Sequence, residues 1–312
     1  DLIIQEDMVV TVSHNGYIKR NPITLYRSQR RGGKGVTGMT TRQEDFVEHL
    51  FVASTHSHIL FFTSSGKVFW QKVYELPQAG RAAMGKAIVN LLNLSPDEGL
   101  AAILAVREFV EGKYIVMATR KGLIKKTPLM AYSRPRAGGI IALSIDADDE
   151  LIAARVTDGS QDILLGSREG KAIRFKETEV RPMGRTARGV RGMTVGKDDV
   201  IIGMEAIGEG ATILTVTENG FGKRTNTEEY RIQGRGGMGI ITIKTTERNG
   251  NVVGMKEVAD DDEVMLITDQ GTIIRMKIKG ISVIGRNTQG VRLINVEMGE
   301  KVVGVAHLAE ED

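Results

Sequence analysis

The sequence predicts an all-β protein made of six repeated units in a propeller-like arrangement, with about four short strands in each unit. Two observations support this prediction. An apolar run ends in a turn glycine six times, at intervals of roughly fifty residues, and helical periodicity is nearly absent between these points. We therefore expect residues 1–312 to form one domain, and to be a fragment of a longer subunit, since residue 1 is Asp. The turn glycines are Gly16, Gly66, Gly122, Gly170, Gly220 and Gly271.

The first two strands of each unit are predicted to form a hairpin around this glycine. Asn15-Gly16 and Asn219-Gly220 stand between apolar runs, and Asn-Gly is typical of a two-residue turn with positive φ at both positions. The opening strands are predicted at 8–12, 59–62, 114–118, 162–165, 212–216 and 263–267. The returning strands include 17–19, 123–126 and 272–276.

The second half of each unit is predicted to hold a linker and two more strands. A large apolar residue stands ten positions after each turn glycine, and we expect it to anchor the linker in the core. These residues are Tyr26, Leu76, Tyr132, Val180, Tyr230 and Ile281. Third strands are predicted at 88–92, 140–145 and 240–243, and fourth strands at 150–156, 200–206, 252–258 and 301–308. The last of these is expected to complete the first blade, and the sequence leaves open whether the ring closes or forms a spiral.

Basic residues recur in phase with the glycines. Most units carry Lys or Arg four positions after the turn glycine, then Arg and Gly at fifteen and nineteen positions, or fourteen and seventeen in the shortened third unit. Equivalent positions in a repeat present their side chains to the same surface, so the pattern is typical of a protein that follows a long polyanion. The predicted rim contacts are Lys19, Arg20, Arg81, Lys125, Lys126, Arg136, Arg174, Arg185, Lys223, Arg224, Arg235, Arg275 and Arg286.

Composition narrows the classes of protein further. The formal net charge is only +3, but residues 8–43 and 113–145 each contain seven Lys or Arg and no acid, whereas acids gather in later turns. We therefore expect one side of the body to be positive and another negative. The chain has no cysteine and no apolar run near the ~18 residues of a membrane span, which fits a cytoplasmic protein and gives no indication of a membrane partner.

The densest basic cluster lies in the first unit. Three cations and three glycines stand within seven residues, so charge is combined with backbone N–H groups that can approach a phosphate closely. We call this segment the box: Gln29, Arg30, Arg31, Gly32, Gly33, Lys34 and Gly35.

Gln-Arg-Arg-Gly-Gly-Lys-Gly in the first of six such units resembles the signature box found in the C-terminal domain of the A subunit of bacterial DNA gyrase, a type IIA topoisomerase. The resemblance covers the whole chain. It implies a six-bladed β-pinwheel whose neighbouring blades exchange strands, with the box on the first blade and double-stranded DNA bent around a basic rim. It also implies wrapping that is largely independent of base sequence.

The same resemblance implies a place in a larger enzyme. The partners would be the gyrase B subunit together with the N-terminal breakage-reunion domain of the A subunit, in a complex with two copies of each, in the bacterial cytoplasm at the nucleoid. The domain itself would have no catalytic residue, no metal and no cofactor. The catalytic tyrosine, ATP and Mg²⁺ would belong to the other domains and subunits, and the outcome would be ATP-dependent negative supercoiling.

Four alternatives remain open. The related domain of topoisomerase IV is similar, but its box is degenerate or missing. A propeller that binds proteins, or a propeller enzyme, would not require phased cations. His49, His56 and His58 offer a weak metal-site alternative without a third convergent ligand.

Overall fold

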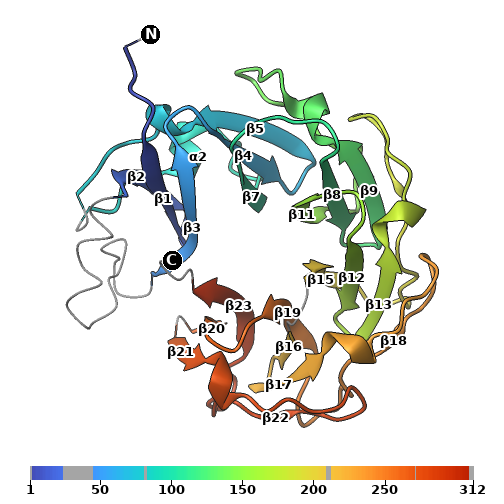
Figure 1. The fold of residues 1–312 in the computed structure, drawn as a ribbon. Coiled ribbons are helices and arrows are strands. Elements are labelled where there is room, and N and C mark those ends of the chain that lie inside the picture. The colour runs from blue at the N-terminus through green and yellow to red at the C-terminus, as the bar shows by residue number, and fades with distance from the viewer. Residues whose placement is uncertain (1, 24–44, 81–82, 209–211, 271, 309–312) are drawn as a thin grey trace.

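The computed structural model describes residues 2–23, 45–80, 83–208, 212–270 and 272–308. These residues form a ring of six small β-sheets, the blades, arranged around a central axis (Figure 1). Five blades have four strands and the sixth has three strands among the described residues. The predicted all-β, six-bladed fold is therefore confirmed.

Each blade is antiparallel, and its strands follow one another from the centre of the ring outward (Figure 1). Blade one contains β3 (Val47–Ser54), β1 (Asp7–Ser13), β2 (Tyr17–Pro22) and β6 (Lys86–Ala87). Blade two contains β7 (Leu100–Val106), β4 (His58–Thr63), β5 (Lys67–Lys72) and β10 (Ile140–Ile141). Blade three contains β11 (Leu151–Thr157), β8 (Tyr114–Thr119), β9 (Leu123–Pro128) and β14 (Val190–Arg191).

The remaining blades repeat this order. Blade four contains β15 (Ile201–Ile207), β12 (Asp162–Ser167), β13 (Lys171–Lys176) and β18 (Ile240–Ile241). Blade five contains β19 (Val252–Val258), β16 (Thr212–Thr217), β17 (Phe221–Asn226) and β22 (Val291–Arg292). Blade six contains β23 (Val302–Leu308), β20 (Glu263–Thr268) and β21 (Ile273–Lys277).

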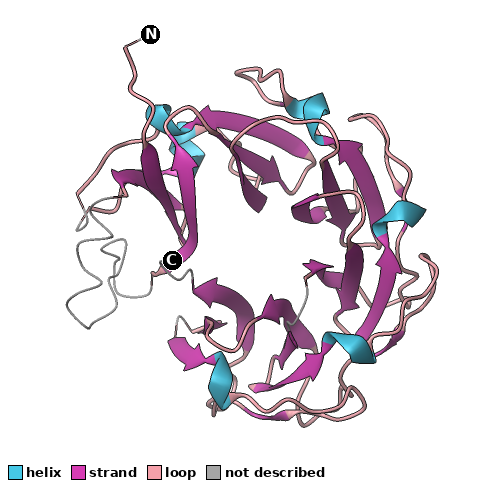
Figure 2. Ribbon diagram, in the orientation of Figure 1, coloured by secondary structure: helices cyan, strands magenta, loops and turns pink. Residues whose placement is uncertain are grey.

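The 3-10 turns of units two to six lie on the outer side of the ring, where these units leave their hairpins (Figure 2). Single 3-10 turns follow the hairpin in units two to six, and unit two adds one α-helical turn. They are η2 (Val73–Glu75), α2 (Ile88–Leu91), η3 (Leu129–Tyr132), η4 (Glu177–Glu179), η5 (Thr227–Glu229) and η6 (Ile278–Gly280).

The outermost strand of a blade comes from the next unit along the chain. Val190 and Arg191, which follow Gly189 of the fourth unit, pair with Ile124 and Leu123 of blade three. The same exchange joins β6 to β2, β10 to β5, β18 to β13 and β22 to β17. The linker that precedes each exchanged strand must therefore cross the outer edge of the preceding blade.

The core lies between the blades. Alternate residues of a strand face opposite sides, so Ile59 and Phe61 of β4 pack toward blade one while Leu60 and Phe62 pack toward blade three. Similar clusters lie between blades three and four, four and five, and five and six. The predicted linker anchors belong to these clusters: Leu76, Tyr132, Val180, Tyr230 and Ile281 are all buried, whereas Tyr26 lies outside the described residues.

The first and sixth blades also contact each other. Phe46, just before β3, packs against Ile267 and Ala306 of blade six in a small buried cluster. Strands β3 and β23 lie side by side at the centre (Figure 1). The question left open by the sequence is thereby answered, because the described residues form a ring whose ends meet.

Two strand predictions were wrong. The final strand does not complete blade one; β23 pairs with β20 along its whole length and is the inner strand of blade six. Residues 88–92 do not form a strand, because Ile88, Leu91 and Leu92 follow a helical spacing and pack into the first core cluster as α2. The other third strands are correct in place but shorter, with only Ile140–Ile141 and Ile240–Ile241 paired.

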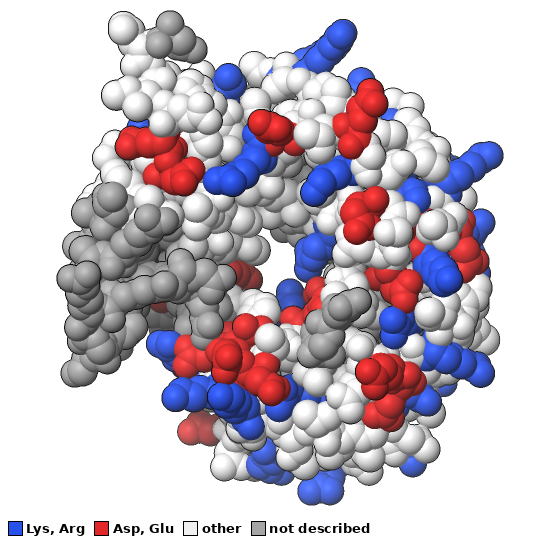
Figure 3. Space-filling model, viewed as in Figure 1, with Lys and Arg blue, Asp and Glu red and all other residues white. Residues whose placement is uncertain are grey.

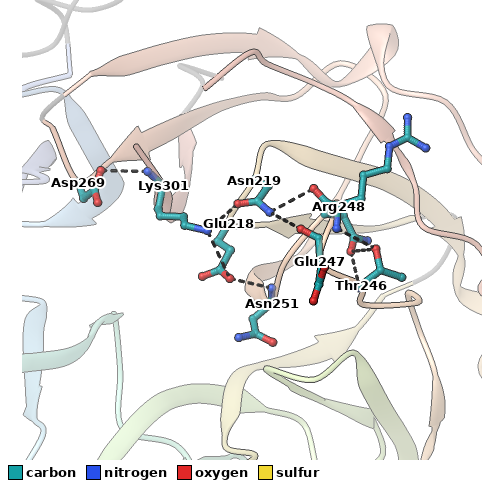
Figure 4. Close-up of polar contacts among 9 residues, drawn as sticks. Glu218, Asn219, Thr246, Glu247, Arg248, Asn251, Asp269 and Lys301 are labelled. Atoms are coloured by element: carbon teal, nitrogen blue, oxygen red, sulfur yellow. Dashed lines mark hydrogen bonds and ion pairs between the residues drawn. The ribbon is translucent and has the colours of Figure 1, made fainter. Parts of the chain in front are cut away.

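Side chains at the hairpin turns add ties between blades, as the contacts of blades five and six show (Figure 4). The Lys301 amide donates to Asp269 in the turn of blade six, while its ammonium donates to Asn219 Oδ1 of blade five at 2.8 Å. Asn219 in turn donates to the carbonyls of Glu247 and Arg248. These turns are thus fixed by local hydrogen bonds.

The recurring glycines are explained by the exchange of strands. Gly189 has φ +90°, and a Cβ placed there would lie 2.5 Å from the Ile124 carbonyl oxygen of the preceding blade. A Cβ on the turn glycine Gly122 would lie 2.3 Å from the Met193 carbonyl oxygen. Both glycines therefore allow two backbones to approach at the point of exchange.

We predict that Gly189→Ala destabilises the fold by at least about 1–2 kcal/mol, the usual cost of a left-handed conformation in a non-glycine residue, before the contact with Ile124 is counted. Gly184→Ala, in the same linker, is the matched control because its Cβ would meet nothing within 4 Å. The control should stay within about 0.5 kcal/mol of wild type. Equal urea-unfolding free energies for the two variants would contradict this explanation of the glycines.

Candidate nucleic-acid interface

The outer rim is formed by the linkers that cross from blade to blade. In four blades, the residue four positions after the turn glycine makes an isolated parallel bridge with the linker of the next unit. In blade three, for example, the amide of Met183 donates to the Lys126 carbonyl at 2.7 Å. The basic residues near these bridges therefore sit at the joint between a blade and the linker that covers it.

The cations at this position are occupied by partners from the crossing linker. Arg20 Nε donates to the Leu76 carbonyl at 2.8 Å, and Arg224 Nε donates to the Ile281 carbonyl at 3.0 Å. Arg174 Nη1 donates to the Thr227 carbonyl at 2.8 Å. These carbonyls lie within or just after the next unit's 3-10 turn, so the cations hold the following linker in place.

Most of these cations also have a carboxylate partner. Arg174 pairs with Asp162, Arg224 with Asp260, Arg275 with Glu263, and the Lys126 ammonium lies 4.0 Å from a carboxylate oxygen of Glu177. The side chains of Lys126 and Arg224 are only 5% and 7% exposed. Their prediction as rim contacts was wrong, because their charge is directed into the joint; a DNA-contacting role for Arg20, Arg174 and Arg275 stays a prediction.

The lysines one position earlier are buried completely. Lys19, Lys125 and Lys223 have no exposed surface. Lys125 Nζ donates to the carbonyls of Ala142 and Arg185, and Lys223 Nζ donates to the carbonyls of Gly285 and Arg286. Lys19 Nζ donates to the carbonyls of Gly80 and Ala83. Their prediction as surface contacts was also wrong, because each ammonium holds the backbone of a crossing linker.

Burial changes the acidity of two of these lysines. Burial, reinforced by repulsion from Arg185, lowers the pKa of Lys125 to about 7. Burial also lowers the pKa of Lys223 to about 8, with Glu229 opposing the change and Arg286 adding to it. An amine can donate to a carbonyl whether or not it is protonated, so the linker contacts do not depend on full charge.

The arginines fifteen positions after the turn glycine, or fourteen in the third unit, lie on the linkers themselves. Arg235 is exposed, but its guanidinium donates to the carbonyls of Glu179 and Arg191. Arg286 donates to the Ile241 carbonyl at 2.9 Å. Among the described residues, the side chains of Arg136 and Arg185 have no hydrogen-bond or ion-pair partner. Arg81 and the whole box, residues 29–35, lie outside the described residues.

Acidic residues have a structural role in the turns. Asp149 accepts hydrogen bonds from the amides of Lys121 and Glu150, and Asp199 accepts from those of Glu169 and Val200. Figure 3 shows Lys and Arg side chains interspersed with Asp and Glu on one face of the ring. The predicted separation of charge is therefore not seen on this face, and the pattern of acids reflects turn capping.

The three histidines of the metal alternative contact separate aromatic rings. His49 stacks on Phe51, whereas His56 and His58 make edge contacts with Tyr74 and Phe109. The described part of the chain contains no group of three His, Asp or Glu residues arranged to hold a metal ion. Within that same part, no helix has the length and apolar character needed to cross a bilayer.

The strand-exchanging blades and the linkers outside them define a six-bladed propeller protein with basic residues at its blade joints and on its outer linkers. The model of the family described as "DNA gyrase C-terminal domain, beta-propeller" matches once per unit. The chain belongs to this family. The matched segments are residues 7–54, 57–107, 113–158, 161–207, 211–259 and 262–308.

The chain is similar to the DNA gyrase A subunit of several bacteria. It is 53% identical over 311 residues to that of Salmonella typhimurium, and 45% identical over 317 residues to that of Streptomyces coelicolor. Each match covers 99% of this chain but only 35% and 37% of the relative. The chain therefore spans about a third of the length of these relatives, which are subunits of a topoisomerase.

Two solved structures share the fold. The C-terminal domain of DNA topoisomerase IV superposes with a TM-score of 0.87 at 25% identity, covering 98% of this chain and 94% of that one. The DNA gyrase A C-terminal domain superposes with a TM-score of 0.74 at 22% identity, covering 97% of this chain and all of that one. The second likeness bears on fold alone.

Proposed function

We propose that this chain binds double-stranded DNA along its outer rim and bends it around the ring, largely independently of base sequence. The observation that carries the proposal is the strand exchange, which lays an arginine-bearing linker across the outer edge of successive blades. Arginine suits this role because its planar guanidinium can bind two phosphate oxygens at once. Contacts to phosphates position DNA without reading its sequence.

Bending requires contacts at several points. Curving 20–30 base pairs by 40–90° costs on the order of 1–6 kcal/mol, so one patch could not hold a long wrap. In our proposal the box binds the outermost stretch of DNA, and arginines without a partner among the described residues, such as the exposed Arg136 and the half-buried Arg185, hold the duplex farther along the rim.

The family supports a role for this domain within a whole gyrase. There the bent segment would be presented to the breakage-reunion domain of the A subunit, with ATP hydrolysis in the B subunit driving negative supercoiling. The catalytic tyrosine and the ATP and Mg²⁺ sites would lie in those other parts, in the bacterial cytoplasm at the nucleoid. On its own, this domain would bend DNA without cutting it.

A role in topoisomerase IV is the second candidate, because a solved C-terminal domain of that enzyme is similar in fold and 25% identical. The intact box at residues 29–35 favours gyrase, since the box is degenerate or missing in the resembling domain.

The proposal is tested by sealing nicked circular DNA with ligase in the presence of the domain. A wrap of fixed handedness must shift the distribution of topoisomers in one sense once the protein is removed, by an amount that grows with the number of domains bound. The same reaction with a charge-matched protein that does not bind DNA is the control. A distribution identical to that of naked DNA, under conditions where the domain is bound, would contradict wrapping.

A further inference from the structure

A hollow of about 450 Å³ lies on the outer linkers beside blade three. One wall is formed by the end of η3 and the linker that follows it. The opposite wall is formed by the crossing linker of the fourth unit. The hollow is lined by Met130, Ala131, Ser133, Arg134, Arg136 and Arg185. Three of its six lining residues are therefore arginines, and none is acidic.

The three arginines have no protein partner, in contrast to the other described cations of the predicted rim set. Arg20, Arg174, Arg224, Arg275, Arg235 and Arg286 all donate to carbonyls or carboxylates. Within the described ranges, no side-chain hydrogen bond or ion pair is made by Arg134, Arg136 or Arg185. Their positive charges line one hollow that has no acidic residue, so an anion that enters it is attracted to all three.

The third unit is built differently at this place. Its arginine and glycine stand at fourteen and seventeen positions after Gly122 instead of fifteen and nineteen, and Pro135 separates Arg134 from Arg136. On the opposite wall, the carbonyl of Arg185 is fixed by the buried ammonium of Lys125. The hollow is thus held on one side by a buried anchor, and it presents a third arginine that the other units lack at the equivalent place.

We propose that this hollow binds backbone phosphates of duplex DNA and is a principal grip on the rim away from the box. The inference rests on the proposed function and deepens it, because it assigns phosphate contacts to Arg134, Arg136 and Arg185 in preference to the other periodic cations. One guanidinium group can bind two phosphate oxygens at once, and the hollow is large enough to hold phosphate groups of one DNA strand.

The test compares two triple variants that lose the same charge. One carries Arg134→Gln, Arg136→Gln and Arg185→Gln. The control carries Arg107→Gln, Arg120→Gln and Arg188→Gln, whose guanidiniums pair with Asp7, Glu150 and Asp146. The dissociation constant for one duplex is measured against salt concentration, and urea unfolding verifies that both variants are folded.

Each phosphate contact contributes about 0.9 to the slope of log affinity against log salt, so the hollow variant should lose about 2.7 and the control almost nothing. If the affinity of the wild-type protein fell steeply with salt and both variants kept the wild-type slope, the phosphate contacts assigned to the hollow would be overturned. The proposed function would then remain intact. If wild-type protein did not bind DNA, the proposed function would fail and this site with it.

A second measurement does not depend on removing charge. The chain has no cysteine, so Ala137→Cys beside Arg136 gives a unique thiol for a tethered DNA-cleaving reagent. Bound duplex should be cut from this position and not from Glu111→Cys, which lies outside the hollow before β8. Absence of cutting from position 137, with the duplex bound, would contradict the site. If a peptide rich in Asp and Glu shielded the introduced thiol from modification while the DNA stayed bound, that result would also contradict the site.

Discussion

Replacing Arg30, Arg31 and Lys34 together by alanine is expected to abolish DNA wrapping and to leave part of DNA binding intact. The box holds three of the six cations that we assign to phosphates, the others being Arg134, Arg136 and Arg185 of the hollow. The remaining three still attract the duplex. A duplex held on one side only will straighten, because bending costs on the order of 1–6 kcal/mol for each 20–30 base pairs.

The expected readouts separate the two effects. In the ligation assay the variant should give the topoisomer distribution of naked DNA, even at concentrations where it is fully bound. Its salt slope should fall to about half the wild-type value, since each contact contributes about 0.9. The charge-matched variant at Arg107, Arg120 and Arg188 should wrap like wild type. A box variant that still shifted the topoisomers normally would show that the box does not fix the wrap.

Much of the fold could be predicted because the repeat appears six times. Each turn glycine located a hairpin, and the buried residues at ten positions after it, such as Tyr132 and Tyr230, located the linker. Repetition averages out the ambiguity of any one unit. Exchange of strands could not be derived from the pattern of residues, because a two-residue strand such as Val190–Arg191 carries no local sign of its partner.

The errors arose where a unit departs from the repeat or lacks a neighbour. The strand predicted at 88–92 followed the analogy with 240–243, although Ile88, Leu91 and Leu92 have helical spacing. The blade of the final strand is predicted wrongly because no later unit follows it to show the pattern. The hairpin of the sixth unit has a free edge that is nearer in sequence, and the final strand, β23, pairs with β20 at that edge.

Too many of the periodic cations are predicted to contact DNA, and the sequence itself contains evidence against some of them. Successive residues of a strand face opposite sides, so Lys125 and Lys126 could not both face the same surface. The position of Lys125 is occupied by Phe69, Ile173 and Ile274 in the second, fourth and sixth units, which indicates a core position. Which arginines lack partners depends on distances across blades, and that required the structure.

The salt dependence of DNA affinity tests the central claim, that cations on the outer linkers contact phosphates of the duplex. Six contacts predict a fall in affinity of about 10³-fold between 50 and 200 mM salt. This fall should be the same for duplexes of unrelated sequence, because phosphates are common to all of them. The measurement is a titration of labelled duplex with the domain at several salt concentrations. A steep, sequence-independent slope is the predicted result, and an affinity that hardly changes with salt would contradict the account.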